Sequence, residues 1–316
     1  MPTARAFVVS LAAFALGAPL TPGSAQAPRP MTFMDQQLMR QAGGAALSPD
    51  GNWMVYTISV PNWKEAKRYT DIYVVNAREG LSSTRQLTFT KDKNENAPRW
   101  SADGKFFVFS SNRDAAGGAP TQQLYMMYPN GGEAQKITDA KDGVGTYAFS
   151  KDGKWLAFSA GKNDEQQVWV LPVAGIDTAK ARLLTKHTTP VGWWRFSADS
   201  KRLYFISPDS VDKANKERME KKFDVKIRNQ DIPLNHLWAL DLATGSEKRL
   251  TSGDAFSVEG VSLSNDGKWA GLRALPNDRY ARTTMEGGNH GDLYLLDLDS
   301  GALERLTENR GISESN

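Results

Sequence analysis

The sequence predicts an all-β protein, a β-propeller built from four-stranded, WD-like blades. Three short markers recur in a fixed order, five times along 316 residues. Repeats of about 40 to 50 residues that each hold four strands are typical of propellers, because each blade buries its apolar faces against its neighbours. We therefore expect five complete blades, which together form part of a seven- or eight-bladed propeller.

The first marker is a Ser-x-Asp-Gly-Lys turn between the first and second strands of each unit. Asp followed by Gly is a strong hairpin signal, because glycine tolerates a positive φ and aspartate bonds nearby backbone groups. In the fourth unit Ser200 replaces the glycine, so we expect this turn to be strained or of a different type. The turns are LSPDGN (47–52), WSADGK (100–105), FSKDGK (149–154), FSADSK (196–201) and LSNDGK (263–268).

The other two markers give the third and fourth strands. The third strand has an aromatic second residue and is apolar at consecutive positions, which indicates burial on both faces. A Leu-Thr or Ile-Thr pair closes the fourth strand. The third-strand runs are IYVV (72–75), LYMM (124–127), VWVL (168–171), LWAL (237–240) and LYLL (293–296), and the closing pairs are 87–88, 137–138, 184–185, 250–251 and 306–307.

The N-terminal region differs from the repeats. Residues 1–27 contain a positive Arg5, an apolar run over 6–20 and an Ala25-Gln26-Ala27 cleavage site, which predict a secretory signal peptide. The alternative is an uncleaved membrane anchor. Residues 28–46 are expected to form a helix, over 31–44, and a lead-in to the propeller at 47–316.

Two insertions interrupt the repeats at the same place, between the second and third strands. The longer one, residues 207–233 in blade four, has Met219, Phe223 and Ile227 at helical spacing, which predicts a short amphipathic helix. The shorter one covers 277–291 in blade five. Insertions at one topological position emerge on one face of a repeat protein, and that face often binds ligands.

The composition excludes several functions. The 39 basic and 36 acidic residues are interspersed, so nucleic-acid binding is not indicated. The chain has no cysteine, which excludes disulfides, a thiol nucleophile and cysteine-ligated metals. His187, His236 and His290 lack the spacing of a metal pair, and no calcium-loop pattern occurs. We expect no metal and no cofactor.

The repeats and their insertions resemble a known family over residues 31–316. The segments LSPDGNWMVYTIS, NENAPRWSADGKFFVFSSNRD and LNHLWALDLATGSEKRLT are similar to the N-terminal propeller of prolyl oligopeptidase family serine peptidases, in the dipeptidyl aminopeptidase and acylaminoacyl peptidase branch. The Ser-x-Asp-Gly phrase also resembles that of Tol-type periplasmic propellers. This second resemblance implies an alternative function, the non-enzymatic binding of a partner protein.

The resemblance to the peptidases implies a gating role. In that family the propeller admits only short peptides to an α/β-hydrolase domain, which follows it in the chain and carries a Gly-x-Ser-x-Gly motif and a Ser, Asp, His triad. Residues 260–264 (GVSLS) lack the final glycine and are expected to be strand core. A sixth turn is expected at about residue 321 by the repeat spacing, so we expect a chain truncated before the hydrolase domain. Its expected partner is then a peptide substrate, bound together with that domain, with no membrane span after signal cleavage.

The resemblance also implies a site for the substrate's free amino group. Dipeptidyl peptidases present a pair of glutamates from the propeller, and paired carboxylates bind an ammonium by charge-assisted hydrogen bonds. Glu217 and Glu220 lie at i, i+3 in the blade-four insertion and are expected to share one helix face. The alternative is a solvated helix that interleaves Glu with Lys. No residue of this chain is expected to be catalytic.

Overall fold

The computed structural model describes residues 29–115, 121–210, 213–221, 233–276 and 291–308. These residues fall into two compact units, which divide between Met39 and Arg40. The expected signal peptide and most of the second insertion lie outside the described residues. Among the described helices, none is long and apolar enough to cross a membrane.

The first unit holds one short helix, α1 (Phe33–Leu38). Thr32 caps its start, and Asp35 returns a hydrogen bond to the backbone of Thr32 in a capping box. The expected helix over 31–44 was therefore too long, since residues from Gln41 on form a strand. Gly43 and Gly44 explain the early end, because glycine disfavours helix and Gly44 has a positive φ of 58°.

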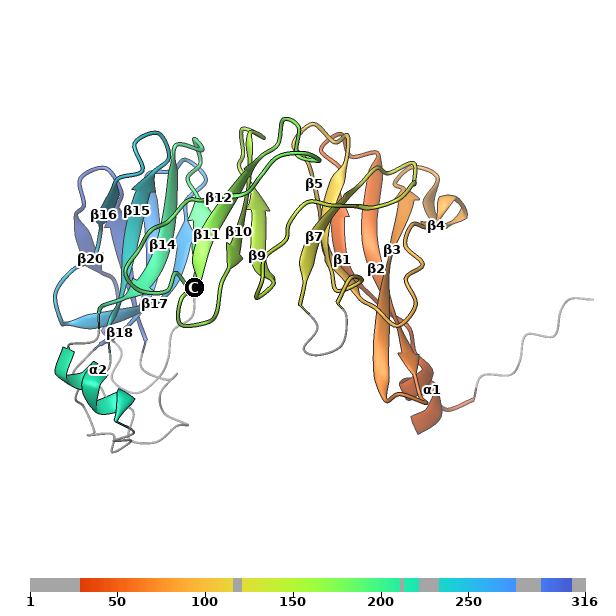
Figure 1. Ribbon diagram of the computed structural model, residues 1–316, viewed down its shortest axis with the longest axis horizontal. Helices are drawn as coiled ribbons and strands as arrows, with labels where there is room; N and C mark the ends of the chain where they lie inside the picture. Colours follow the sequence, from red (N-terminus) through yellow and green to blue (C-terminus); the bar gives the residue numbers. More distant parts are fainter. Residues whose placement is uncertain (1–28, 116–120, 211–212, 222–232, 277–290, 309–316) are drawn as a thin grey trace, which may run out of the picture. The chain divides into compact units, whose positions relative to one another are not determined.

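The second unit consists of five antiparallel sheets of four strands each, which we call blades 1 to 5 in chain order (Figure 1). Blade 1 contains β1 (Gln41–Leu47), β2 (Trp53–Asn62), β3 (Lys67–Asn76) and β4 (Arg85–Gln86), with a 3-10 turn at Gly80–Ser83. Blade 2 contains β5 (Glu95–Trp100), β6 (Phe107–Ser111), β7 (Gln123–Met127) and β8 (Gln135–Lys136). Blade 3 contains β9 (Val144–Phe149), β10 (Trp155–Ala160), β11 (Gln167–Pro172) and β12 (Arg182–Leu183).

Blades 4 and 5 repeat this order. Blade 4 contains β13 (Trp194–Phe196), β14 (Arg202–Pro208), β15 (Asn235–Asp241) and β16 (Glu247–Arg249), with helix α2 (Lys213–Glu220) in the insertion between β14 and β15. Blade 5 contains β17 (Phe256–Leu263), β18 (Trp269–Pro276), β19 (Asp292–Asp297) and β20 (Leu303–Arg305). The predicted four-stranded blades are confirmed.

The first marker is a hydrogen-bonded turn. In blade 2 the Ser101 hydroxyl donates to the Asp103 carboxylate at 2.7 Å, and this carboxylate also accepts the backbone N–H of Lys105 at 3.2 Å. The same serine oxygen accepts the N–H of Phe106, where the next strand is about to begin. The other four turns repeat all three bonds. Serine and aspartate therefore recur because together they close the hairpin.

The fourth turn keeps this geometry without glycine. Ser200 has a φ of 57°, close to the 70° of Gly153 at the same place in blade 3. Of the two expected outcomes, the strained one holds, because a left-handed conformation is unfavourable for a residue with a Cβ. The Ser200 hydroxyl accepts the backbone N–H of Asp152 at 3.1 Å, so this turn is bonded to that of blade 3.

The closing threonine also has a structural explanation. The buried Thr185 hydroxyl accepts the backbone N–H of Val168 at 2.9 Å and donates to Gln167 Oε1 at 2.8 Å. It thereby joins the end of the fourth strand to the start of the third. The N–H bond recurs in every blade, at Thr88, Thr138, Thr251 and Thr307.

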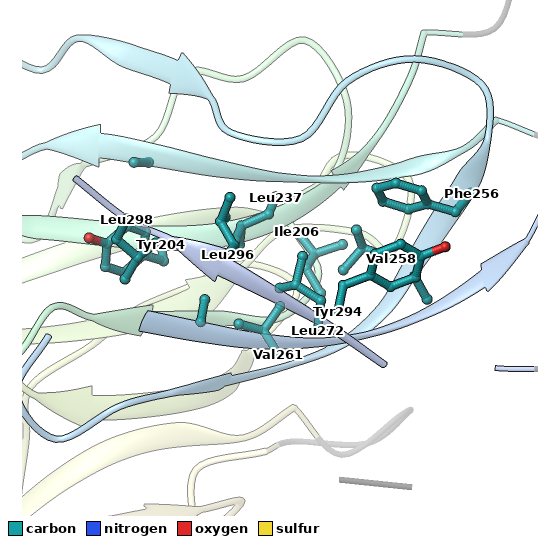
Figure 2. Packing of buried hydrophobic residues seen from close by; sticks show 13 residues of the cluster. Tyr204, Ile206, Leu237, Phe256, Val258, Val261, Leu272, Tyr294, Leu296 and Leu298 are labelled. Carbon is teal, nitrogen blue, oxygen red and sulfur yellow. The ribbon is translucent and has the colours of Figure 1, made fainter. Parts of the chain in front are cut away.

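Four buried clusters pack consecutive blades together. One cluster joins each pair of neighbours from blades 1 and 2 to blades 4 and 5. Figure 2 shows the last of these, where Leu237 of blade 4 packs near Leu272 and Leu296 of blade 5. First strands are also bonded across blades, since Trp100 Nε1 donates to the carbonyl of Ala46 at 2.9 Å. Burial on both sheet faces explains why the third strands read as continuous apolar runs.

Candidate functional site on the insertion face

In each blade the second strand ends, and the third strand begins, at the same end of the sheet. We call this end the insertion face. It is formed by the second-to-third-strand connections, among the described residues at 63–66, 112–115, 121–122, 161–166, 209–210, 213–221, 233–234 and 291. Figure 1 shows α2 beyond this end of blade 4. The longest insertion of the chain therefore extends from this face, as the repeats predict for a binding surface.

The two predicted glutamates lie on α2. Glu217 and Glu220 are both exposed and are spaced i, i+3, which places them on neighbouring positions of one helix face. The helix is shorter than the expected amphipathic segment, since Phe223 and Ile227 fall outside the described residues. An exposed carboxylate pair on this face is accessible to a cationic group.

A buried ion pair lies in blade 2 at the same face. The Arg113 guanidinium lies 3.2 Å from Glu95 Oε1, and the Glu95 side chain is completely buried. The Ser111 hydroxyl donates to the same oxygen at 3.0 Å. Arg113 also lies over the rings of Phe109 and Tyr125, at 5.2 and 4.7 Å from the ring centres. These contacts hold the guanidinium in one place.

The electrostatics of this pair are unusual for a blade core. Burial raises the pKa of Glu95, and the positive charge of Arg113 opposes part of this rise. Burial also raises the pKa of nearby Asp71, against a hydrogen bond from Thr88 and the charge of Arg113. One arginine thus stabilises the ionised form of two carboxylates, so its loss would affect both blades.

Sequence reasoning missed Glu95 and Arg113, although the repeats contained a signal. Aligning the first strands on the turn places Val144, Val191 and Val258 at the position of Glu95. All three valines are buried. A carboxylate that stands where three other blades have valine departs from the repeat for a reason other than packing.

The histidines are not brought together. His187 Nδ1 lies 2.7 Å from Glu247 Oε2, whereas His236 lies between Thr251 and Asp209, and His290 is outside the described residues. Among the described residues, no group of three or more His, Cys, Asp or Glu side chains is arranged for a metal ion. Residues 260–263 belong to β17, as expected for a strand, but only Val261 is buried and Ser262 is exposed, so the expectation that they are core was wrong.

His236 is a pH-sensitive position in blade 4. Its ring is fully buried, with Nε2 3.4 Å from Asp209 Oδ2 and Nδ1 3.2 Å from the Thr251 hydroxyl. Burial lowers the pKa of His236, the charge of Arg249 lowers it further, and Asp209 opposes both. The folded protein therefore favours the neutral ring.

We predict that His236→Gln reduces the loss of folding stability that occurs as pH falls below neutrality. The pKa of this histidine is lower in the folded than in the unfolded state. Its contribution to the free energy of unfolding is therefore fully present above about pH 6.5 and is lost as pH falls, because the unfolded chain then binds the proton more readily. Glutamine suits this position, because Gln123 and Gln167 occupy it in blades 2 and 3 and bond the closing threonine. Urea unfolding at several pH values should show a smaller loss for the variant than for the unchanged chain between about pH 7.5 and 5. Equal losses would contradict this assignment.

Comparisons with known proteins agree with the fold and the repeats. No protein-family model matches the sequence. The chain is 30% identical over 122 residues to dipeptidyl-peptidase 5 of Porphyromonas endodontalis, a match that covers 39% of this chain and 16% of that protein. It is 36% identical over 114 residues to dipeptidyl-peptidase 5 of Porphyromonas gingivalis, covering 36% and 16%.

Similarity to a solved structure identifies the fold. The β-propeller domain of the Trilobed protease from Pyrococcus furiosus matches with a TM-score of 0.54 at 14% identity, over 84% of this chain and 71% of that one. The predicted resemblance is confirmed. The chain is similar in sequence to dipeptidyl-peptidases and folds like the propeller region of such a peptidase. The sequence matches span only 16% of the length of either relative.

Proposed function

We propose that this chain is the substrate-gating propeller of an exported serine peptidase that cleaves short peptides near their N-terminus. The observation that carries the proposal is the sequence similarity to two proteins named dipeptidyl-peptidase 5. A Gly-x-Ser-x-Gly motif does not occur in the 316 residues, so the nucleophile is assigned to a hydrolase domain that follows the propeller.

The outer face of blade 5 supports a continuation of the propeller. In β19 the buried side chains alternate with half-buried ones, so that Tyr294 and Leu296 are covered while Leu293 and Leu295 are not. In β7 of blade 2, by contrast, all five residues are buried. The half-buried leucines offer an apolar surface of the kind that the next blade covers in a propeller.

We further propose that Glu217 and Glu220 bind the free amino group of the peptide. Their exposure on the insertion face supports this assignment, because a carboxylate must be accessible to receive a substrate ammonium. The buried Glu95 is unsuited to the same task, and we assign it to anchoring the Arg113 guanidinium within blade 2.

Coding DNA beyond Asn316 tests the proposal at the level of sequence. We expect at least one more Ser-x-Asp-Gly blade, then Gly-x-Ser-x-Gly, then the Asp and His of the triad in that order. A gene that ends within one blade of Asn316 would instead favour the alternative, a Tol-type propeller that binds a partner protein without chemistry.

Export is a separate part of the proposal. The charged, apolar and small-residue segments of residues 1–27 support cleavage after Ala27, into the periplasm or the medium. We predict that N-terminal sequencing of the protein from the exported fraction gives a chain that starts at Pro28. A purified protein that retains Met1 would contradict cleavage and favour a membrane anchor.

A further inference from the structure

A large cavity lies between blades 2 and 3, and we call it the blade-3 cavity because most of its lining residues belong to blade 3. The proposed peptidase function does not use it. Its volume is about 920 Å³, and it lies between the residues at and after β8, 136–142, and the face of β10 to β12. Phe158, Trp169 and Leu183 contribute apolar wall. This volume is near the upper end of the range of about 300 to 1,000 Å³ for ligand pockets in proteins.

Trp169 is the feature that distinguishes this cavity from the rest of the repeat. Other blades cover the aromatic residue at this position. Arg113 lies 4.7 Å from the ring centre of Tyr125 in blade 2, and the His187 ring lies 4.5 Å from that of Trp238 in blade 4. Among the described residues, none places a ring or a cation against Trp169. Its indole is half-buried and lines the cavity.

The sequence of blade 3 explains why the indole is uncovered. The residues that match Ser111, Asn112 and Arg113 of blade 2 are Ala160, Gly161 and the exposed Lys162. Gly161 has a φ of 116°, and a Cβ there would lie 3.1 Å from the carbonyl oxygen of Glu165. A side chain at this place is therefore disfavoured by both φ and space, which leaves one end of the cavity open.

The rim indicates which ligands fit. Lys141 and Lys180 are exposed beside the cavity, and so are Asp142 and Glu165. Lys136 and Asp139, which pair at 2.8 Å, also line the cavity, so its three basic and three acidic side chains balance. The rim therefore favours neither an anion nor a cation and suits a ligand that carries both signs. An aromatic ring gains from offset or edge contact with another ring, beyond the apolar area that it buries.

We propose that the blade-3 cavity binds a short peptide through one aromatic side chain, with Trp169 as the contact. The ring fits against the indole and the small side chains of Ala140, Ala160 and Ala181. The remaining volume accepts the neighbouring residues of the peptide, whose charged groups face the mixed rim. This site lies in the propeller alone and needs neither a hydrolase domain nor Glu217 and Glu220.

Fluorine NMR of the 316-residue chain tests this assignment. The probe is the tripeptide Ala-Phe-Ala with 4-fluorophenylalanine at its centre, titrated to about 5 mM, where weak binding is still detectable. We expect a shifted and broadened signal. Ala181→Leu fills the cavity and should weaken binding by about tenfold or more, whereas Ala174→Leu, an exposed residue outside the cavity in the same β11–β12 connection, should leave it unchanged.

A second variant and two competing ligands complete the experiment. Trp169→Leu keeps an apolar side chain and should also weaken binding, so the test stands even if Ala181→Leu fails to fold by circular dichroism. Unlabelled Ala-Leu-Ala should not displace the probe. No binding by the unchanged chain, undiminished binding by the folded cavity variants, or displacement by Ala-Leu-Ala would overturn the proposal. Equal affinity for free 4-fluorophenylalanine would also overturn it, in favour of a small aromatic molecule.

Discussion

Replacing Arg113 by methionine is expected to lower the free energy of unfolding by about 3–5 kcal/mol near neutral pH. The loss arises because Glu95 is completely buried and Arg113 is the cation that faces it. Burial already raises the pKa of Glu95. A carboxyl whose pKa is raised on folding favours the folded state when protonated, so stability falls as pH rises through the folded pKa. Without Arg113 this fall becomes steeper, and urea unfolding should show a larger defect at about pH 8 than at pH 5.

The repeat supplies the control for this experiment. Blade 3 has Val144 at the position of Glu95, and that valine is buried in the cluster between blades 2 and 3. The double variant Glu95→Val with Arg113→Met should therefore recover most of the lost stability, because an apolar pair replaces a broken ion pair. A double variant as unstable as Arg113→Met, or a defect that does not depend on pH, would contradict this account of Glu95.

Replacing Glu217 and Glu220 by glutamine in the complete enzyme is expected to lower kcat/KM for dipeptidyl substrates with a free amino group by about 10- to 100-fold. A hydrogen bond to a charged group contributes about 1.5–3 kcal/mol, and each 1.4 kcal/mol corresponds to a factor of about ten. The measurement is hydrolysis of dipeptidyl nitroanilides, with the free and the N-acetylated form of each substrate compared.

Two comparisons make that result specific to the amine. Glu133→Gln, an exposed glutamate between β7 and β8, should leave kcat/KM unchanged. The acetylated substrate lacks the ammonium, so the double variant should hydrolyse it as fast as the unchanged enzyme does. If the preference for free amines over acetylated ones is the same in both enzymes, Glu217 and Glu220 do not belong to the site.

Local chemistry made most of the blades predictable from sequence. The Ser101 and Asp103 turn closes through bonds that span at most five residues, so its pattern is visible in the chain. The third strands were equally clear, because sheet faces covered on both sides need continuous apolar runs. The N-terminal helix was overestimated, since residues 41–47 pair with β2 as the first strand of blade 1.

The polar features that depend on distant residues were not predictable in the same way. Glu95 and Arg113 meet across 18 positions, and their partnership follows from the pairing of β5 with β6. Only an alignment of the repeats, with valine at the Glu95 position in three other blades, points to it. The cavity beside Trp169 arises because blade 3 has no described residue that covers the ring as Arg113 does in blade 2. Markers that all blades share do not reveal such a difference.

The most direct test of the central proposal is peptidase activity, measured side by side for the 316-residue chain and the product of the complete gene. A fluorophosphonate probe reports an activated serine, and dipeptidyl nitroanilides report turnover. The account predicts that the complete product is labelled and hydrolyses these substrates, whereas the 316-residue chain does neither. A complete product that folds but is neither labelled nor active would contradict it, and so would an active 316-residue chain.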